Sequence, residues 1–289
     1  MDNYIDLHMH TTASDGIYTR EEIIRKAKEK GLKAISITDH DTLDAYDGFD
    51  VNNQGIDVLP GVELVCTAGK SPIEVLCYGF DVALMRTFMR EHCPDHVKDS
   101  YYKTIRECRV FKELGVDISF DAKNFDYLAP GAWAIRALWL ELIKNPKAVE
   151  LMKQEDPKFC EVDKYFFRQG INNKNSKFFV DMSDIYVSLA ELREFCDKTG
   201  ALMFLAHPFE YTENMDYVLN IAKDYVHGIE VYHPSADEEG RVYLEAFAKE
   251  HNLLISGGSD YHGFRGKLNS EKIDKAVYDD IIKNLAVNV

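Results

Sequence analysis

The chain has 289 residues, a formal net charge of −15 and a hydrophobic fraction of 46%. A surface this acidic repels polynucleotide phosphate and counts against a long nucleic acid as partner, although cations bound at a site can reverse the charge locally. Apolar runs are too short to span a bilayer, the N-terminus does not resemble a signal peptide, and the six cysteines include no Cys-x-x-Cys pair, so we expect a cytoplasmic protein with reduced thiols and no membrane contact.

The first 84 residues alternate between strand and helix patterns. Apolar runs predict four strands, at 4–7, at 33–38, at 56–59 continuing into 62–66, and at 73–78. Thr19 and Glu22 have the spacing of a capping box, which predicts that a helix begins there, and Gly31 is placed to end it.

Residues 85–186 break this alternation. They are rich in aromatic residues and in Lys, Glu and Asp, and helices are predicted at about 101–114 and 130–142. We interpret this segment as an inserted, mainly helical cap subdomain.

Alternation resumes after residue 186. Ser188 and Glu191 form a second capping box, and Gly200 is placed to end its helix. Further strands and helices are predicted at 201–206, 215–224, 228–232, 237–250 and 253–256.

Residues of the types that commonly bind metals, His, Asp and Glu, follow most of these strands. Repeated strand–helix units favour a parallel sheet, and polar residues at the carboxyl ends of its strands usually build the active site. The candidates at such ends are His8, His10, His40, Glu63, His207, His233, Asp260 and His262, and Asp15 follows shortly after the first pair. A barrel gathers strand ends from both halves of the chain into one ring, so we expect an α/β barrel formed by residues 1–84 and 187–289 rather than an open sheet.

A metal site is the simplest account of this pattern. A single His-x-His pair is weak evidence, because a histidine after a strand is usually a hydrogen-bonded structural residue. Several Asp, Glu and His side chains buried together, however, are costly without a compensating cation.

The motifs also resemble one family. They are His8-Met9-His10, Ser14-Asp15-Gly16, Thr38-Asp39-His40-Asp41, Gly61-Val62-Glu63, Ala206-His207-Pro208 and Gly258-Ser259-Asp260-Tyr261-His262. In this order they resemble the PHP superfamily, the polymerase and histidinol phosphatase domains, and most of all its stand-alone phosphoesterases with an inserted helical subdomain. Some of those act on nucleoside 3′,5′-bisphosphates, and others trim short RNA from the 5′ end. The resemblance implies a distorted (β/α)7 barrel with two or three divalent metal ions (Mn, Fe, Zn or Mg).

The resemblance also implies a ligand set. One metal would be bound by His8, His10, Glu63 and Asp260. A second would share Glu63 and add His207, and a third would be bound by Asp15, His40 and His262. Glu63 is the natural bridge, because a carboxylate has two oxygens to offer.

Two positions depart from the family pattern. Glu74 occupies the place of a histidine in the segment Glu74-Val75-Leu76-Cys77-Tyr78-Gly79. As a ligand it would favour Mn²⁺, Fe²⁺ or Mg²⁺ over an all-nitrogen zinc site; the alternative is a polar edge residue beside a weak or absent second metal. In the insertion, Gly131-Ala132-Trp133 stands where relatives often carry Arg-x-His, with Arg136 three residues on.

Other residues have weaker signals. His233 could contact phosphate or protonate a leaving group, or could be an ordinary loop histidine. Arg136 and Lys177 are candidate phosphate contacts, with solvated surface as the alternative. Asp39 and Asp41 flank His40 and could orient its ring.

The resulting hypothesis is hydrolysis of a small phosphate monoester, a nucleotide or nucleoside bisphosphate, by metal-activated water. His233 and Asp260 are the predicted catalytic residues, with Asp260 also a metal ligand. Three alternatives stay open: a 5′-to-3′ exonuclease on short oligonucleotides, a histidinol-phosphatase-like enzyme, and a non-enzymatic metal-binding domain. The oligomeric state stays open as well.

Overall fold

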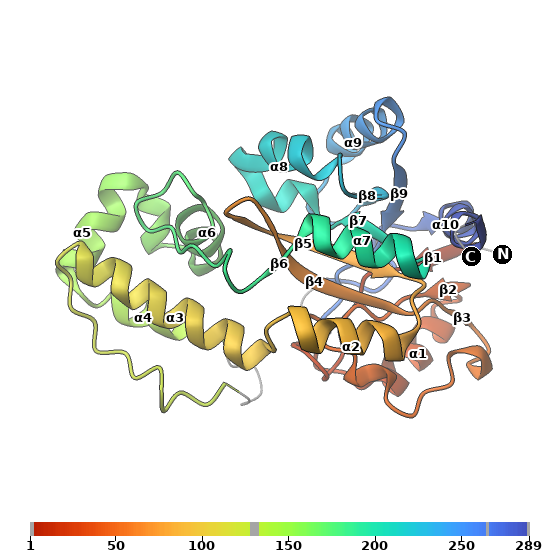
Figure 1. Ribbon diagram of the computed structural model, residues 1–289, viewed down its shortest axis with the longest axis horizontal. Helices are drawn as coiled ribbons and strands as arrows, with labels where there is room; N and C mark the ends of the chain where they lie inside the picture. Colours follow the sequence, from red (N-terminus) through yellow and green to blue (C-terminus); the bar gives the residue numbers. More distant parts are fainter. Residues whose placement is uncertain (1–2, 128–132, 264–265, 288–289) are drawn as a thin grey trace. The chain divides into compact units, whose positions relative to one another are not determined.

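The computed structural model describes residues 3–127, 133–263 and 266–287. The chain divides into two compact units (Figure 1). Unit 1 comprises Met1–Ala68, Ile73–Cys93 and Val187–Val289, and unit 2 comprises Gly69–Pro72 and Pro94–Tyr186.

The strands form two sheets. They are β1 (Tyr4–Asp6), β2 (Ala34–Ile35), β3 (Asp57–Val58), β4 (Gly61–Ala68), β5 (Ser71–Tyr78), β6 (Val187–Ser188), β7 (Leu202–Leu205), β8 (Gly228–Tyr232), β9 (Leu254–Gly257) and β10 (Ile273–Asp274). The sheet orders are β10-β1-β2-β3 and β6-β4-β5-β7-β8-β9. Parallel pairing predominates, as in β1–β2, β2–β3, β7–β8 and β8–β9, which confirms the predicted α/β class with parallel sheets.

Two isolated parallel bridges connect the sheets. One joins Met9, after β1, to Tyr261, after β9, and the other joins His40, after β2, to Glu63 in β4. A hydrogen bond from the Leu7 amide to the Gly257 carbonyl, 3.2 Å, lies beside the first bridge. The described residues nevertheless form two sheets, so closure into a single barrel stays a prediction.

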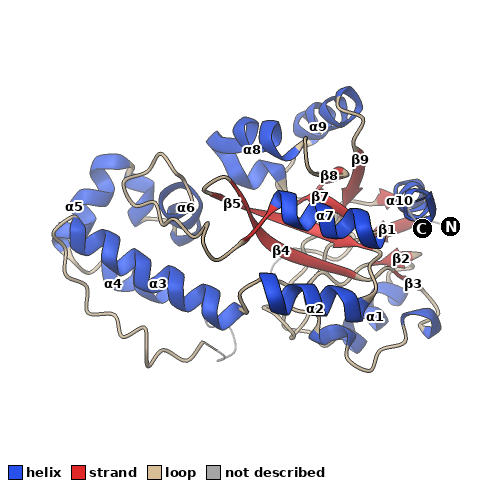
Figure 2. Cartoon of the chain, viewed as in Figure 1, coloured by secondary structure: helices blue, strands red, loops and turns tan. Residues whose placement is uncertain are grey.

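Helices cover the sheets of unit 1 (Figure 2). They are α1 (Arg20–Glu29), α2 (Val82–His92), α7 (Leu189–Thr199), α8 (Met215–Ala222), α9 (Glu238–Glu250) and α10 (Lys275–Val287). Helix α9 contacts β8 and β9, and α10 contacts β1 and β9, so the last helix of the chain packs on its first strand.

The strands of unit 1 bury both faces. Val75 and Cys77 of β5 belong to a large apolar cluster with the helices, whereas Leu76 and Tyr78 of the same strand belong to a second cluster. The four residues of β7 alternate in the same way. Strands buried on both faces read as continuous apolar runs, which is why the sequence pattern located them.

Unit 2 is mainly helical. Its elements are α3 (His96–Glu113), α4 (Ala134–Leu142), α5 (Pro146–Glu155), α6 (Asp163–Phe166), a π-helix at Phe167–Ile171 and a 3-10 turn at Pro157–Cys160. The rings of Phe111, Phe166 and Phe178 pack together inside it.

No helix among the described residues is long and apolar enough to cross a membrane.

The structure confirms both capping boxes, at Thr19–Glu22 and Ser188–Glu191, and a left-handed Gly200 after α7. It corrects the strand predicted at 56–66, which splits into β3 and β4. Pro60 has no amide hydrogen to donate, and the Gly61 amide donates to the Tyr46 hydroxyl instead of a neighbouring strand. Helix α2 belongs to unit 1, although residues 85–92 were expected in the insertion.

Candidate metal centre

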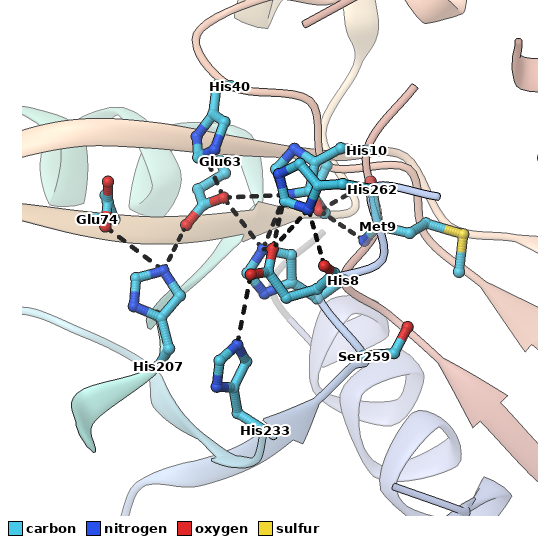
Figure 3. A network of polar contacts seen from close by, with 12 residues as sticks. His8, Met9, His10, His40, Glu63, Glu74, His207, His233, Ser259 and His262 are labelled. Atoms are coloured by element: carbon cyan, nitrogen blue, oxygen red, sulfur yellow. Dashed lines mark hydrogen bonds and ion pairs between the residues drawn. The ribbon is translucent and has the colours of Figure 1, made fainter. Parts of the chain in front are cut away.

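The nine predicted metal ligands lie in adjoining clusters within unit 1 (Figure 3). His8 and His10 follow β1, His40 follows β2, His207 follows β7, and Asp260 and His262 follow β9. Glu63 departs from the expected strand-end position, because it lies inside β4, whereas Glu74 lies inside β5, in agreement with the strand predicted at 73–78. Strand β5 runs antiparallel to β7, and its Glu74 carbonyl accepts the Ala206 amide, so Glu74 stands beside His207.

The central cluster consists of His8, His10, Glu63 and Asp260. The Nε2 atom of His8 lies 3.0 Å from Glu63 Oε2 and 3.4 Å from Asp260 Oδ1. The Nε2 atom of His10 lies 3.3 Å from Glu63 Oε2 and 3.1 Å from Asp260 Oδ1. Four donor atoms from three parts of the chain therefore converge on one point.

A second cluster uses the other oxygen of Glu63. His207 Nε2 lies 2.9 Å from Glu63 Oε1 and 3.4 Å from Glu74 Oε2. Glu63 thus has one oxygen in each cluster, which is the arrangement that a bridging carboxylate requires.

The third cluster consists of His10, Asp15, His40 and His262. Asp15 Oδ1 lies 3.1 Å from His262 Nε2 and 3.7 Å from His10 Nδ1. His10 therefore faces two clusters, one with each ring nitrogen, whereas the ligand set inferred from the sequence gave it only to the first.

In these clusters, burial and neighbouring charges shift the pKa values of the side chains in opposite directions. Burial disfavours the charged ring of His10, but hydrogen bonds to Asp260 and Glu63 raise its pKa to about 10. Burial likewise opposes protonation of His207, yet the Glu210 and Glu63 carboxylates raise its pKa to about 9. Burial opposes ionisation of Glu63, but the His40 and His8 rings hold the pKa of Glu63 well below its usual range. The cluster therefore favours the ionised form of Glu63, whose charge protons on the rings or metal ions can balance.

The donor set fits divalent cations. His8 Nδ1 contacts Glu230 Oε1 at 2.9 Å, and His262 Nδ1 contacts the Asp260 carbonyl at 2.8 Å. Both partners only accept hydrogen bonds, so each Nδ1 carries the proton and the Nε2 lone pair of a neutral ring faces the cluster. Moreover, His8 Nε2 and His10 Nε2 stand 3.2 Å apart, so two nitrogen donors point at the same space as two carboxylates.

Three buried acids that the sequence analysis did not assign as ligands hold these elements in place. Glu230 of β8 accepts from the His207 amide at 2.8 Å as well as from His8. Asp6 of β1 accepts from the Ser259 amide and hydroxyl, 2.8 and 2.6 Å, and its burial raises its pKa to about 6. Asp39 accepts from the Thr11 amide at 2.7 Å and the Ser14 hydroxyl at 2.6 Å, so it fixes the loop that carries Asp15 rather than the His40 ring.

For two of these acids, Asp6 and Glu230, the sequence alone could have indicated a role in orienting the site. Asp6 and Glu230 are single acids inside apolar strands, and each is at most 1% exposed. A charged residue on a fully buried strand needs a built-in partner, and such a residue is therefore a candidate for orienting a site.

The backbone is strained at the same place. Asp41, His207 and Asp260 have positive φ angles of 49°, 29° and 49°. Non-glycine residues rarely adopt this conformation, and it is concentrated at functional sites where the surrounding structure enforces it. At His207 and Asp260 it turns the chain sharply as the strand ends, which brings both side chains into the clusters.

Of the remaining candidates, His233 lies in a further donor group with Glu210 and Asp260, whereas Arg136 and Lys177 lie in unit 2. His233 stands at the edge of the central cluster, with Nε2 at 3.8 Å from Asp260 Oδ2. Arg136 and Lys177 belong to unit 2, where they contact Asp163 at 3.0 Å and Glu155 at 4.0 Å. Gly131 and Ala132 lie outside the described residues, and Trp133 packs edge-on against Phe167, as expected of a core aromatic.

Residues 6–286 match the model of one protein family, the PHP domain. Curated proteins with similar sequences include a 5′-3′ exoribonuclease of Haemophilus influenzae, 24% identical over 270 residues that span 89% of each chain. A phosphoribosyl 1,2-cyclic phosphate 1,2-diphosphodiesterase of Eggerthella lenta is 23% identical over 91% of this chain and 95% of its own. A 3′,5′-nucleoside bisphosphate phosphatase of Chromobacterium violaceum is 24% identical over 89% and 87%.

A solved structure from Bifidobacterium adolescentis, described as a proposed metal-dependent phosphoesterase, aligns with a TM-score of 0.62 at 20% identity. The alignment covers 97% of this chain and 96% of the other. The likeness concerns the fold, and it agrees with the mixed α/β architecture of the two units.

Proposed function

This chain belongs to the PHP domain family, and we propose that it is a metal-dependent phosphoesterase that hydrolyses a small phosphate monoester, a nucleotide or nucleoside bisphosphate. The observation that carries the proposal is the convergence of nine Asp, Glu and His side chains into three adjoining clusters. Relatives at 23–24% identity act on a bisphosphate, a cyclic phosphate and RNA, which supports phosphoester chemistry and leaves the substrate to be proposed.

The barrel is part of this proposal. We propose that the two isolated bridges join the two sheets into a ring with the order β1, β2, β4, β5, β7, β8 and β9. A ring of this kind would gather strand ends from both ends of the chain, as the ligand clusters require.

In this proposal the protein's own residues position the reaction. Glu63 and Asp260 each offer one oxygen to the central cluster, and Glu230 and the Asp260 carbonyl fix the ring orientation of His8 and His262. Divalent cations bound there would lower the pKa of a water molecule and neutralise charge on the phosphoryl oxygens. Mn²⁺, Fe²⁺ or Mg²⁺ suits the carboxylate-rich second cluster, where Glu74 joins Glu63 and His207.

A substrate screen tests the proposal. Purified protein with Mn²⁺ is assayed on nucleoside monophosphates, nucleoside 3′,5′-bisphosphates, sugar phosphates, histidinol phosphate and short oligonucleotides. We expect release of phosphate from a nucleotide, and its loss by at least a hundredfold in His40→Ala with the fold retained by circular dichroism. A metal-free preparation that stays fully active would contradict the proposal.

The runner-up is a 5′-directed exonuclease on short oligonucleotides, favoured by the Haemophilus influenzae relative. The net charge of −15 counts against it, because an acidic surface repels a polyanion. Turnover of oligonucleotides without turnover of mononucleotides in the same screen would replace the leading proposal by this one.

A further inference from the structure

His233 differs from the candidate ligands in the proton that its ring carries. The Ser235 backbone amide donates to His233 Nδ1 at 3.1 Å. A backbone amide can only donate, so Nδ1 accepts, and a neutral ring must carry its hydrogen on Nε2. His8 and His262 have the opposite arrangement, with the proton on Nδ1 and the Nε2 lone pair toward the metal clusters.

The ring is held by its own turn. The Ala236 amide donates to the His233 carbonyl at 3.0 Å, which closes a four-residue turn with Pro234 at its second position. Proline fixes the backbone there, and the Ser235 hydroxyl also lies 2.8 Å from Nδ1. The direction of the Nε2–H bond is therefore set before any substrate arrives.

This donor has no partner among the described residues. His233 is 2% exposed, and its Nε2 makes no hydrogen bond. The nearest carboxylate oxygen, Asp260 Oδ2, is 3.8 Å away, too far for one. A buried donor without a partner destabilises the protein, and a ligand atom bound beside it would remove that cost.

The surroundings select the kind of ligand atom. Carboxylate oxygens of Glu210 and Asp260 lie within 4.8 Å of the His233 ring nitrogen. Two acids repel a fully charged phosphoryl oxygen, whereas an ester oxygen is nearly neutral until its bond to phosphorus breaks. We infer that His233 is a catalytic residue, rather than a metal ligand, that donates a hydrogen bond from Nε2 to the leaving oxygen of the phosphate ester. Water forms the new bond to phosphorus as the ester P–O bond breaks, and one proton of that water ends on the alcohol that leaves.

This inference rests on the proposed function and predicts a leaving-group effect. A nucleoside monophosphate expels an alcohol, whose oxygen needs the donor, whereas p-nitrophenyl phosphate expels a stable phenolate that does not. We expect His233→Ala to lower kcat about a hundredfold on the nucleotide and less than about threefold on p-nitrophenyl phosphate. His233→Gln, which keeps an N–H near the Nε2 position, should recover part of the loss.

Metal content gives a readout independent of activity. Elemental analysis of the Mn²⁺-loaded protein should give the same number of equivalents in wild type, His233→Ala and His233→Gln. Tyr232→Phe, in the same strand end but bonded outward to Glu245, is the matched control and should change neither esterase rate.

Three outcomes would overturn the inference. Equal losses on both esters would assign His233 to phosphoryl binding or to structure, and a lower Mn²⁺ count would make it a metal ligand. A wild-type protein that hydrolyses neither ester would contradict the proposed function itself, and the inference with it. If His233→Ala does not fold, the two rates of His233→Gln decide, because a weakened donor still affects the alcohol ester more.

Discussion

If the second cluster binds a metal, we expect its metal preference to depend on Glu74. Its carboxylate lies 3.4 Å from His207 Nε2, and its backbone pairs with Ala206. The contact supports the ligand hypothesis over the edge-residue alternative, because Glu74 belongs to the same donor group as Glu63 and His207.

We predict that Glu74→Ala loses about one equivalent of bound Mn²⁺. Glu74→His should keep the metal count and shift the Zn²⁺-to-Mn²⁺ affinity ratio about tenfold toward zinc, because nitrogen replaces a hard oxygen. Elemental analysis after dialysis against each metal measures both. An unchanged count in Glu74→Ala would favour the edge-residue alternative.

His227 lies outside the candidate metal clusters, and it should make the free energy of unfolding depend on pH. Its Nδ1 accepts the Met203 amide at 3.1 Å, and its Nε2 lies 3.3 Å from Asp197. Burial, followed by the Arg193 guanidinium, lowers its pKa from 6.5 to about 4. Between pH 6.5 and 4 the unfolded chain therefore binds one more proton than the folded protein, and the free energy of unfolding falls as the pH falls.

We predict that His227→Asn removes this effect, because the Asn amide oxygen can still accept the Met203 amide and does not titrate. Relative to wild type, the variant should gain about 1 kcal/mol of stability between pH 7 and pH 5, a value reduced for partial solvent screening. Urea unfolding at the two pH values measures the difference. A constant difference between the two proteins would mean that His227 does not control acid sensitivity.

At the level of elements, the position of the loop after β9 depends on a close approach of Gly258 to His8, just after β1. A Cβ atom at Gly258 would lie 2.3 Å from both the Cβ and the backbone nitrogen of His8. No real contact is that short, so any side chain at this position must push the loop or His8 aside.

Gly258→Ala should therefore displace His8 and weaken Mn²⁺ binding at least tenfold, as measured by calorimetric titration. Gly31→Ala is the control, since no atom lies near its added Cβ; Gly31 has a positive φ, 74°, which Gly258 does not share. The control should lose stability through backbone strain and bind Mn²⁺ normally. Equal Mn²⁺ affinity in the two variants would show that the close approach does not set the position of His8.

The sequence patterns predicted those helices and strands that are determined by their own residues rather than by contacts with distant segments. Strands buried on both faces and helices with capping boxes were found because the signal is local. The two-residue strands β3, β6 and β10 were not resolved as such, because they exist through pairing with distant partners, as β10 does with Tyr4 and Ile5. The antiparallel direction of β5 was missed for the same reason, although the strand itself was predicted.

The ligand set was predictable from motifs, but its proton arrangement was not. Whether a histidine offers a lone pair or a hydrogen depends on what its other nitrogen contacts, such as Glu230 for His8 and the Ser235 amide for His233. These contacts depend on tertiary structure in the first case and on turn geometry in the second. Substrate choice also stays beyond the sequence, since Gly131 and Trp133 replace the expected Arg-x-His pair without indicating another contact.

At the scale of the whole molecule, metal binding should stabilise unit 1 as a unit. Its ligands come from both ends of the chain, so ions that bind only the folded protein shift the folding equilibrium. One site at a hundredfold excess over its Kd contributes about 2.7 kcal/mol.

We predict that removing metal with a chelator lowers the Tm by about 5 °C, measured by scanning calorimetry, and that added Mn²⁺ restores it. His10→Asn, which faces two clusters, should start with a lower Tm and respond less to the chelator. Identical melting of wild type with and without chelator would argue that the clusters do not bind metal under these conditions.

The pairing of β1 with the end of the chain also sets the order of events during translation. Asp6 cannot accept its hydrogen bond from the Ser259 amide until Ser259, 253 residues later, has been synthesised. The Leu7 amide likewise has no Gly257 carbonyl to donate to before that stage. A nascent chain therefore carries the His8–His10 pair and Glu63 well before Asp260, the second acid of the central cluster, has been synthesised. If the clusters bind metal, the centre can assemble only after Asp260 and His262 have been synthesised, so a shorter nascent chain should be a poor competitor for cellular metal.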